Sequence, residues 1–113
     1  MTNITIRKAE GTWVVRAGGA VLGESQNVLE LSEGDAEPVI YFPREDIAMA
    51  FLDESDKQAE DTAKGTANFF SIVTKSTTLE NAAWSYDAPS ETAARIKGHL
   101  AFSTGEKLAV ERV

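Results

Sequence analysis

Short runs of β-branched and aromatic residues recur along the chain, and clusters of turn residues separate them. The clearest runs are TWVVR at 12–16, VIYF at 39–42, ANFFSIV at 67–73 and NAAWSY at 81–86. Such compositions favour strands. Weaker patterns predict strands at the N-terminus, around 21–22, at 28–31, and in a closing hairpin formed by 99–103 and 106–113. We therefore expect about eight strands in one compact, mainly antiparallel β domain that spans residues 1–113.

Two short helices are predicted between these strands. Pro43 suits the first position of a helix, and the segment 43–53 that follows it places apolar residues on one face. The second helix falls within 87–98, where Ser90 can cap the beginning and Gly98 can end it in the left-handed conformation. The glycine-rich segment 17–19 is typical of a hairpin turn. The acidic segment 53–65 shows no periodicity, so we expect an exposed loop there.

Charge and composition exclude several classes of protein. The 113 residues are 42% hydrophobic, as in ordinary globular domains, and they include no cysteine, which rules out disulfides and thiolate zinc sites. The formal net charge is −7, and the sequence lacks the basic stripe that nucleic-acid-binding proteins carry. No segment has the composition of a signal peptide or a membrane span. A cytoplasmic protein that binds neither nucleic acid nor membranes is expected.

Sequence motifs for metals and cofactors are missing. His99 is the one histidine, and the acids around Asp53 lack the glycine and spacing of a calcium-binding loop. No nucleophile-elbow, Walker or dinucleotide-binding pattern occurs. We expect no metal site and no cofactor.

Polar and aromatic residues gather where strands meet their connections, which is where rigid scaffolds usually present functional side chains. An arginine and a lysine with aromatic neighbours could hold a phosphate or carboxylate and stack a planar ring. The candidate ligand-binding residues are Tyr41, Arg44 and Asp46 after VIYF, Lys64 and Gly65 before ANFFSIV, and Trp84, Ser85 and Tyr86 at the end of NAAWSY.

Each of these residues also has a purely structural interpretation. Trp84 and Tyr86 could be core residues with one hydrogen-bonded polar tip. Arg44 could form a surface salt bridge, Asp46 could be a first-turn helix carboxylate, and Lys64 could be a solvated loop charge.

The order YFPRED, then Lys-Gly before an aromatic strand, then NAAWSY, then IKGHLAF resembles the family called domain of unknown function 427. The resemblance runs from about Gly18 to Lys107 and implies a β-tent fold. Family collections attach a nucleotidyltransferase-like label to it. Carried across by motif, the candidate positions are those above together with Pro43, Lys97 and Gly98. The family usually has a Cys-Pro-aromatic stretch before Lys-Gly, where this chain has Asp61, Thr62 and Ala63, and Phe69 stands in the place of a tyrosine.

Three functions stay open. The first is a domain that binds a small anionic or planar ligand through Arg44, Lys64 and an aromatic face. The second is a nucleotidyltransferase-like enzyme, although Glu45 and Asp46 are adjacent and would diverge by about 100° on a helix, so they make no metal clamp alone. The third is a structural or interaction protein whose β edges pair into a homodimer. The sequence fits a monomer or a homodimer.

Overall fold

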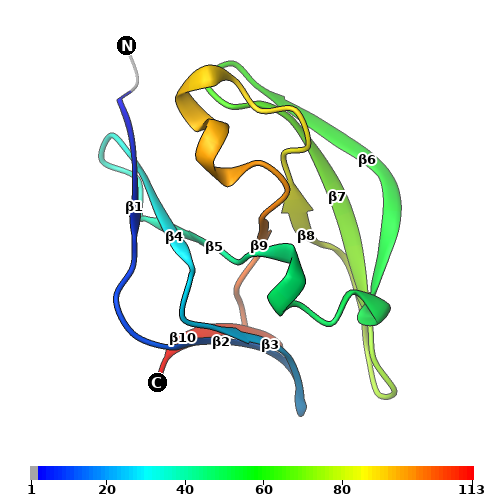
Figure 1. Cartoon of the computed structure of the whole chain (residues 1–113). Helices are drawn as coiled ribbons and strands as arrows, with labels where there is room; N and C mark the ends of the chain where they lie inside the picture. Colours follow the sequence, from blue (N-terminus) through cyan, green and yellow to red (C-terminus); the bar gives the residue numbers. More distant parts are fainter. Residues whose placement is uncertain (1–2) are drawn as a thin grey trace.

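A computed structural model of the protein describes residues 3–113, and it is mainly β, as predicted (Figure 1). Its ten strands form three antiparallel sheets, of order β1–β4–β5, β10–β2–β3 and β6–β7–β8–β9. The first sheet contains β1 (Ile4–Lys8), β4 (Leu29–Glu33) and β5 (Val39–Tyr41). The second contains β2 (Trp13–Ala17), β3 (Ala20–Ser25) and β10 (Leu108–Arg112). The third contains β6 (Leu52–Asp61), β7 (Gly65–Val73), β8 (Thr78–Ser85) and β9 (Leu100–Phe102).

The first and third sheets stand on either side of the molecule, and the second lies across one end (Figure 1). The residue after β5 joins two of them, because Phe42 and Leu100 exchange two backbone hydrogen bonds of 2.8 Å. The β2–β3 hairpin turns at Gly18 and Gly19, where Gly18 has a φ of 59°, as the sequence predicts. The β-tent arrangement stays a prediction.

Two separate apolar clusters are buried. The larger one surrounds Phe42, Phe70 and Leu100, and the smaller one surrounds Tyr41, Tyr86 and Ile96. Neighbouring residues of VIYF therefore serve different clusters, since Tyr41 enters the smaller and Phe42 the larger. The same division holds along β7, where Phe69 packs on the smaller cluster and Phe70 belongs to the larger. Burial on both faces explains why apolar residues are adjacent in these runs instead of alternating with polar ones.

The expected loop at 53–65 is wrong, because this segment forms most of β6 and pairs with β7 from Leu52–Ile72 to Asp61–Gly65. The sequence of β6 shows no alternation of apolar and polar residues because β6 is an edge strand with mostly exposed side chains. A register shift between Glu54 and Gln58 also interrupts the alternation of its two faces.

The helices are also shorter than expected. The segment 43–53 contains two 3₁₀ turns, η1 (Arg44–Asp46) and η2 (Met49–Phe51), and the later segment contains η3 (Glu91–Ile96). Ser90 does not cap η3, because its hydroxyl donates instead to the Ala63 carbonyl at 2.7 Å. Gly98 does follow η3 in the left-handed conformation, with a φ of 72°. Within residues 3–113, no helix is long and apolar enough to cross a membrane.

The predicted closing hairpin is wrong as well. β9 pairs with β8, whereas β10 pairs with β2 in another sheet. Only an isolated bridge between Gly105 and Leu108 lies in the connection between them. Strand pairing across sheets depends on tertiary contacts that local turn residues do not encode.

Candidate functional site

A cavity of about 300 Å³ opens between the first and third sheets. Its walls come from β4, β5, β6, β7 and β8 and from the segments that directly follow them. The lining residues are Leu31, Glu33, Ala36, Glu37, Val39, Tyr41, Ala59, Glu60, Asp61, Lys64, Ala67, Phe69, Trp84 and Tyr86.

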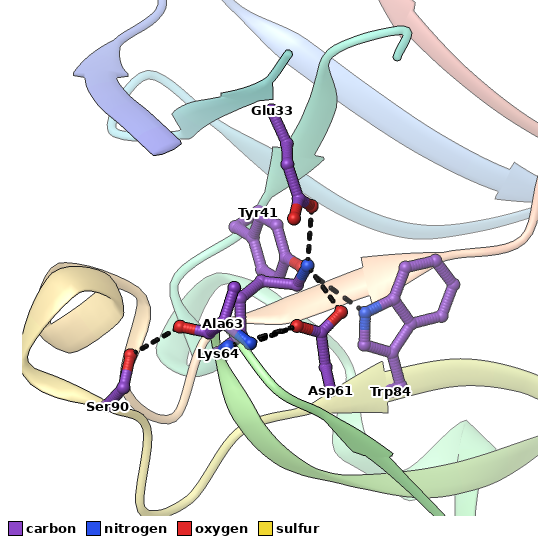
Figure 2. A network of polar contacts seen from close by, with 7 residues as sticks. All are labelled: Glu33, Tyr41, Asp61, Ala63, Lys64, Trp84 and Ser90. Atoms are coloured by element: carbon purple, nitrogen blue, oxygen red, sulfur yellow. Dashed lines mark hydrogen bonds and ion pairs between the residues drawn. The ribbon is translucent and has the colours of Figure 1, made fainter. Parts of the chain in front are cut away.

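Four aromatic side chains form much of the cavity wall. Phe69 and Trp84 are cross-strand partners on β7 and β8, and their ring centroids lie 6.2 Å apart at an interplanar angle of 40°. Tyr41 ends β5, and its hydroxyl accepts a 3.3 Å hydrogen bond from the Trp84 indole nitrogen (Figure 2). Tyr86, one residue beyond β8, is 4% exposed. Phe69 and Trp84 are half-buried, so a ligand can reach their rings.

The cavity contains an ion-pair cluster of one buried lysine and two partly exposed carboxylates, shown in Figure 2. The Lys64 ammonium lies 2.7 Å from the Glu33 carboxylate and 2.8 Å from the Asp61 carboxylate, and the lysine side chain is 9% exposed. The other Asp61 oxygen accepts hydrogen bonds from the amides of Ala63 and Lys64, at 2.8 and 3.1 Å. Ser90 fixes the same turn, donating its amide to the Lys64 carbonyl at 2.9 Å. The lysine is thus held in place from several sides.

These contacts shift the pKa values of both partners. Burial opposes charge on Lys64, but its bonds to Asp61 and Glu33 outweigh burial and raise its pKa above the ordinary value. Burial acts on Asp61 too, and the hydrogen bonds from Lys64 and the Ala63 amide outweigh it and lower the Asp61 pKa. At neutral pH the site therefore contains a protonated ammonium between two carboxylates. An amine held in this state is a poor nucleophile.

Both tyrosines of the chain line the cavity, so phenol ionisation reports on this site alone. Burial raises the pKa of Tyr41 to about 12 and also raises that of Tyr86. Because the folded pKa exceeds the unfolded value near 10, the phenols stabilise the fold below about pH 10. That stabilisation is lost as pH rises through the folded values.

We expect an alkaline absorbance titration at 295 nm to show no tyrosinate step near pH 10 in the folded protein. The same protein in urea should titrate near pH 10, where free phenols ionise. Circular dichroism at each pH would identify where unfolding begins. A native step near pH 10 involving both phenols would contradict the buried positions of Tyr41 and Tyr86.

The structure brings together four of the eight candidate residues from the sequence: Tyr41, Lys64, Trp84 and Tyr86. The solvated-charge interpretation of Lys64 is wrong, since the residue is 7% exposed. Gly65 follows Lys64 in the chain but does not line the cavity. Gly65 is the first residue of β7 and has a φ of 113°, and a Cβ there would lie 3.2 Å from the Ala88 carbonyl oxygen. Its role is therefore to allow this backbone conformation and the close approach of the Ala88 segment.

Arg44, Asp46 and Ser85 do not line the cavity. Arg44 lies over the Phe70 ring, with its guanidinium carbon 5.6 Å from the centroid, and forms a 3.6 Å surface ion pair with Asp87. Asp46 is in η1 and accepts a 2.6 Å hydrogen bond from the Ser25 hydroxyl. Ser85 is fully buried, and its hydroxyl has no hydrogen-bond partner within residues 3–113. The structural interpretation of Arg44, a surface salt bridge, is confirmed.

The ligand-binding candidates from the sequence do not include Glu33, Asp61 or Phe69. Asp61 was hidden by the loop expected at 53–65, because a loop gives no alternation of faces. Phe69 was detectable, since it lies two residues after Ala67 on the same face of a strand. Nothing near Glu33 in the sequence signals its long-range contact with Lys64.

Within residues 3–113, no group of three or more His, Cys, Asp or Glu side chains is arranged to hold a metal ion. A family model described as Domain of unknown function (DUF427) matches residues 5–113. In a search of curated proteins, none matches the chain.

Proposed function

The chain belongs to the domain of unknown function 427 family, and we propose that it is a small-ligand-binding domain that takes a planar ligand in the cavity between its first and third sheets. One observation carries this proposal. Aromatic side chains from β5, β7 and the end of β8 converge on a cavity of about 300 Å³, which is at the small end of the range for ligand sites.

The aromatic walls support a flat ligand. Phe69 and Trp84 are half-buried, their ring planes lie at 40° to each other, and the accessible part of such rings favours stacked or edge contacts with another aromatic ring. The polar groups of the site support specific orientation of that ligand. The Tyr41 hydroxyl accepts a hydrogen bond from Trp84 and donates none within residues 3–113, so its proton is available to a ligand.

Of the two expected ligand types, planar and anionic, the charges favour the planar one. An anion site needs basic groups that are free to pair with the ligand. Lys64 is already paired with Glu33 and Asp61, and Arg44 does not line the cavity. A phosphate or carboxylate would therefore have to displace an internal carboxylate.

The alternatives have less support. The family label refers to nucleotidyl transfer, which requires carboxylates for a metal and basic groups for phosphates. Here the two innermost carboxylates are committed to Lys64. A homodimer through the edge strand β6 would bring Asp53, Glu54 and Asp56 of one copy close to the same acidic group of the other, and facing like charges destabilise strand pairs.

A thermal-shift screen with planar heteroaromatic compounds tests the proposal. A ligand at 100 times its dissociation constant adds about 2.7 kcal/mol, which raises the melting temperature by several degrees. The affinity for a hit should fall about fivefold in Phe69→Leu, because this substitution removes a ring from the cavity wall. The matched control is Phe51→Leu, since Phe51 packs on the larger cluster away from the cavity. Equal weakening in both variants, or no hit in a broad panel, would overturn the proposal.

Arg44 offers a separate prediction. We expect Arg44→Ala to leave the affinity for such a hit unchanged within about twofold, because an exposed ion pair contributes at most about 1 kcal/mol to stability and nothing to this cavity. Isothermal titration of the two proteins would measure it. A tenfold loss of affinity would mean that the ligand site extends to the Arg44 side of β7.

A further inference from the structure

The cavity combines its aromatic walls with an excess of negative charge. Four carboxylates line it, on Glu33, Glu37, Glu60 and Asp61, against the single ammonium of Lys64, which leaves a formal charge of −3. Lys64 satisfies Glu33 and Asp61 directly. Glu37 and Glu60 are exposed and form no ion pair within residues 3–113. Their charge is available to a ligand at the mouth of the cavity.

An independent observation concerns Phe69. The ammonium of Lys57, on β6, lies 4.6 Å from the centroid of the Phe69 ring, well within the range of a cation–π contact. A ring of the cavity wall therefore already holds a positive charge from the chain itself. The negative face of an aromatic ring attracts cations, and the nearby carboxylates strengthen that attraction.

A third observation concerns Tyr86. This side chain is 4% exposed and lines the cavity, yet its hydroxyl has no hydrogen-bond partner within residues 3–113. The charges of Lys64, Asp61 and Glu33 all act on that hydroxyl, so it lies near the ion-pair cluster. Within residues 3–113 the Ser85 hydroxyl is the one buried side-chain oxygen without a partner, so the Tyr86 oxygen is not sealed off and a ligand in the cavity can hydrogen-bond to it.

We infer that the ligand is an organic cation, with its flat ring against Phe69 and Trp84 and its positive charge toward Glu37 and Glu60. This inference rests on the proposed function, because it specifies the charge of the planar ligand. Lys57 then acts as an internal competitor, since the bound cation and the Lys57 ammonium use the same Phe69 ring. The overall charge of −7 favours the approach of such a ligand.

A charge series on one ring system tests the inference. The probes are N-methylquinolinium, quinoline and quinaldate, which are cationic, neutral and anionic at pH 7.5. Binding is followed by the Trp84 indole N–H signal in two-dimensional NMR. Trp13 lines a neighbouring cavity that shares Trp84 and Glu37, so a shift of the Trp84 signal without a shift of the Trp13 signal identifies binding at the proposed site. We expect the cation to bind about fivefold or more tightly than quinoline, and quinaldate to bind least tightly. High salt should weaken the binding of the cation and of neither other probe.

Two pairs of variants identify the groups responsible. The double variant Glu37→Gln, Glu60→Gln should lower the affinity for the cation at least threefold and leave the affinity for quinoline unchanged. The charge-matched control is Asp53→Asn, Glu54→Gln, because these β6 acids do not line the cavity. Lys57→Ala should raise the affinity for the cation about two- to fivefold. Lys75→Ala, which removes the same charge elsewhere, should leave that affinity unchanged.

The outcomes separate the two proposals. Equal binding of all three probes, or tightest binding of quinaldate, would overturn the cation inference and leave the planar-ligand function standing. No shift of the Trp84 signal by any probe at millimolar concentration would count against both.

Discussion

Replacing Lys64 with methionine is expected to lower the free energy of unfolding by about 3 kcal/mol. Methionine keeps most of the aliphatic stem but removes the ammonium between Glu33 and Asp61. Breaking a buried ion pair costs about 3–5 kcal/mol because the remaining charge loses its partner. The lower end applies here, since the Glu33 and Asp61 side chains are 26% and 34% exposed and water partly screens them.

Urea denaturation of wild type and Lys64→Met at neutral pH measures this difference. The control is Lys75→Met, because Lys75 is exposed and forms no ion pair within residues 3–113. The Asp61 pKa is lowered in the folded protein, so its contribution is present above the ordinary value of 3.8 and is lost as pH falls below it. The difference between wild type and variant should therefore shrink in acid. A neutral-pH difference below about 0.5 kcal/mol would contradict the ion-pair account.

Gly65→Ala should be the second most damaging of these changes, at about 2–3 kcal/mol. Gly65 has a φ of 113°, which L-residues rarely adopt, and a Cβ would lie 3.2 Å from the Ala88 carbonyl oxygen. Moving this backbone would also disturb the neighbouring bond from the Ser90 amide to the Lys64 carbonyl. The substitution therefore combines backbone strain with a steric conflict beside the ion-pair cluster.

Gly34→Ala is the matched control for this change. Gly34 also has a positive φ, of 56°, but no atom lies within 4 Å of the Cβ position. An alanine there should cost about 1 kcal/mol from the left-handed conformation alone. Thermal and urea unfolding of both variants would measure the contrast. If Gly65→Ala proves as mild as Gly34→Ala, the close approach to Ala88 carries no weight in the stability of the turn.

The strands that sequence reasoning predicted well are those buried on both faces. VIYF is continuously apolar and ANFFSIV contains adjacent phenylalanines because Phe42 and Phe70 enter one cluster while Tyr41 and Phe69 face the other. Such runs are recognisable locally. The strand β6 was not recognisable, because an exposed edge strand needs no apolar period and is held by its pairing with β7 on both sides of the register shift. The separation of β9 and β10 likewise depends on which neighbours the tertiary structure supplies.

The site was half predictable for a related reason. Aromatic residues at strand ends led to Tyr41, Trp84 and Tyr86, because these positions follow from the strand pattern. Arg44 was expected at the site on the basis of its charge, and its position depends on the 3₁₀ turn η1, which directs it to Phe70 and Asp87. The partners of Lys64 could not be predicted, since Glu33 lies 31 residues away in the sequence and only the packing of β4 against the turn after β6 brings it near.

The most direct test of the central claim is an intermolecular NOE experiment on the quinoline complex. The account predicts contacts from the ligand ring protons to the Phe69 and Trp84 side chains, and none to Trp13, whose ring lies outside the cavity. Contacts confined to Trp13, or to Arg44 and Phe70 on the other face of β7, would show that the ligand binds elsewhere and would contradict the account.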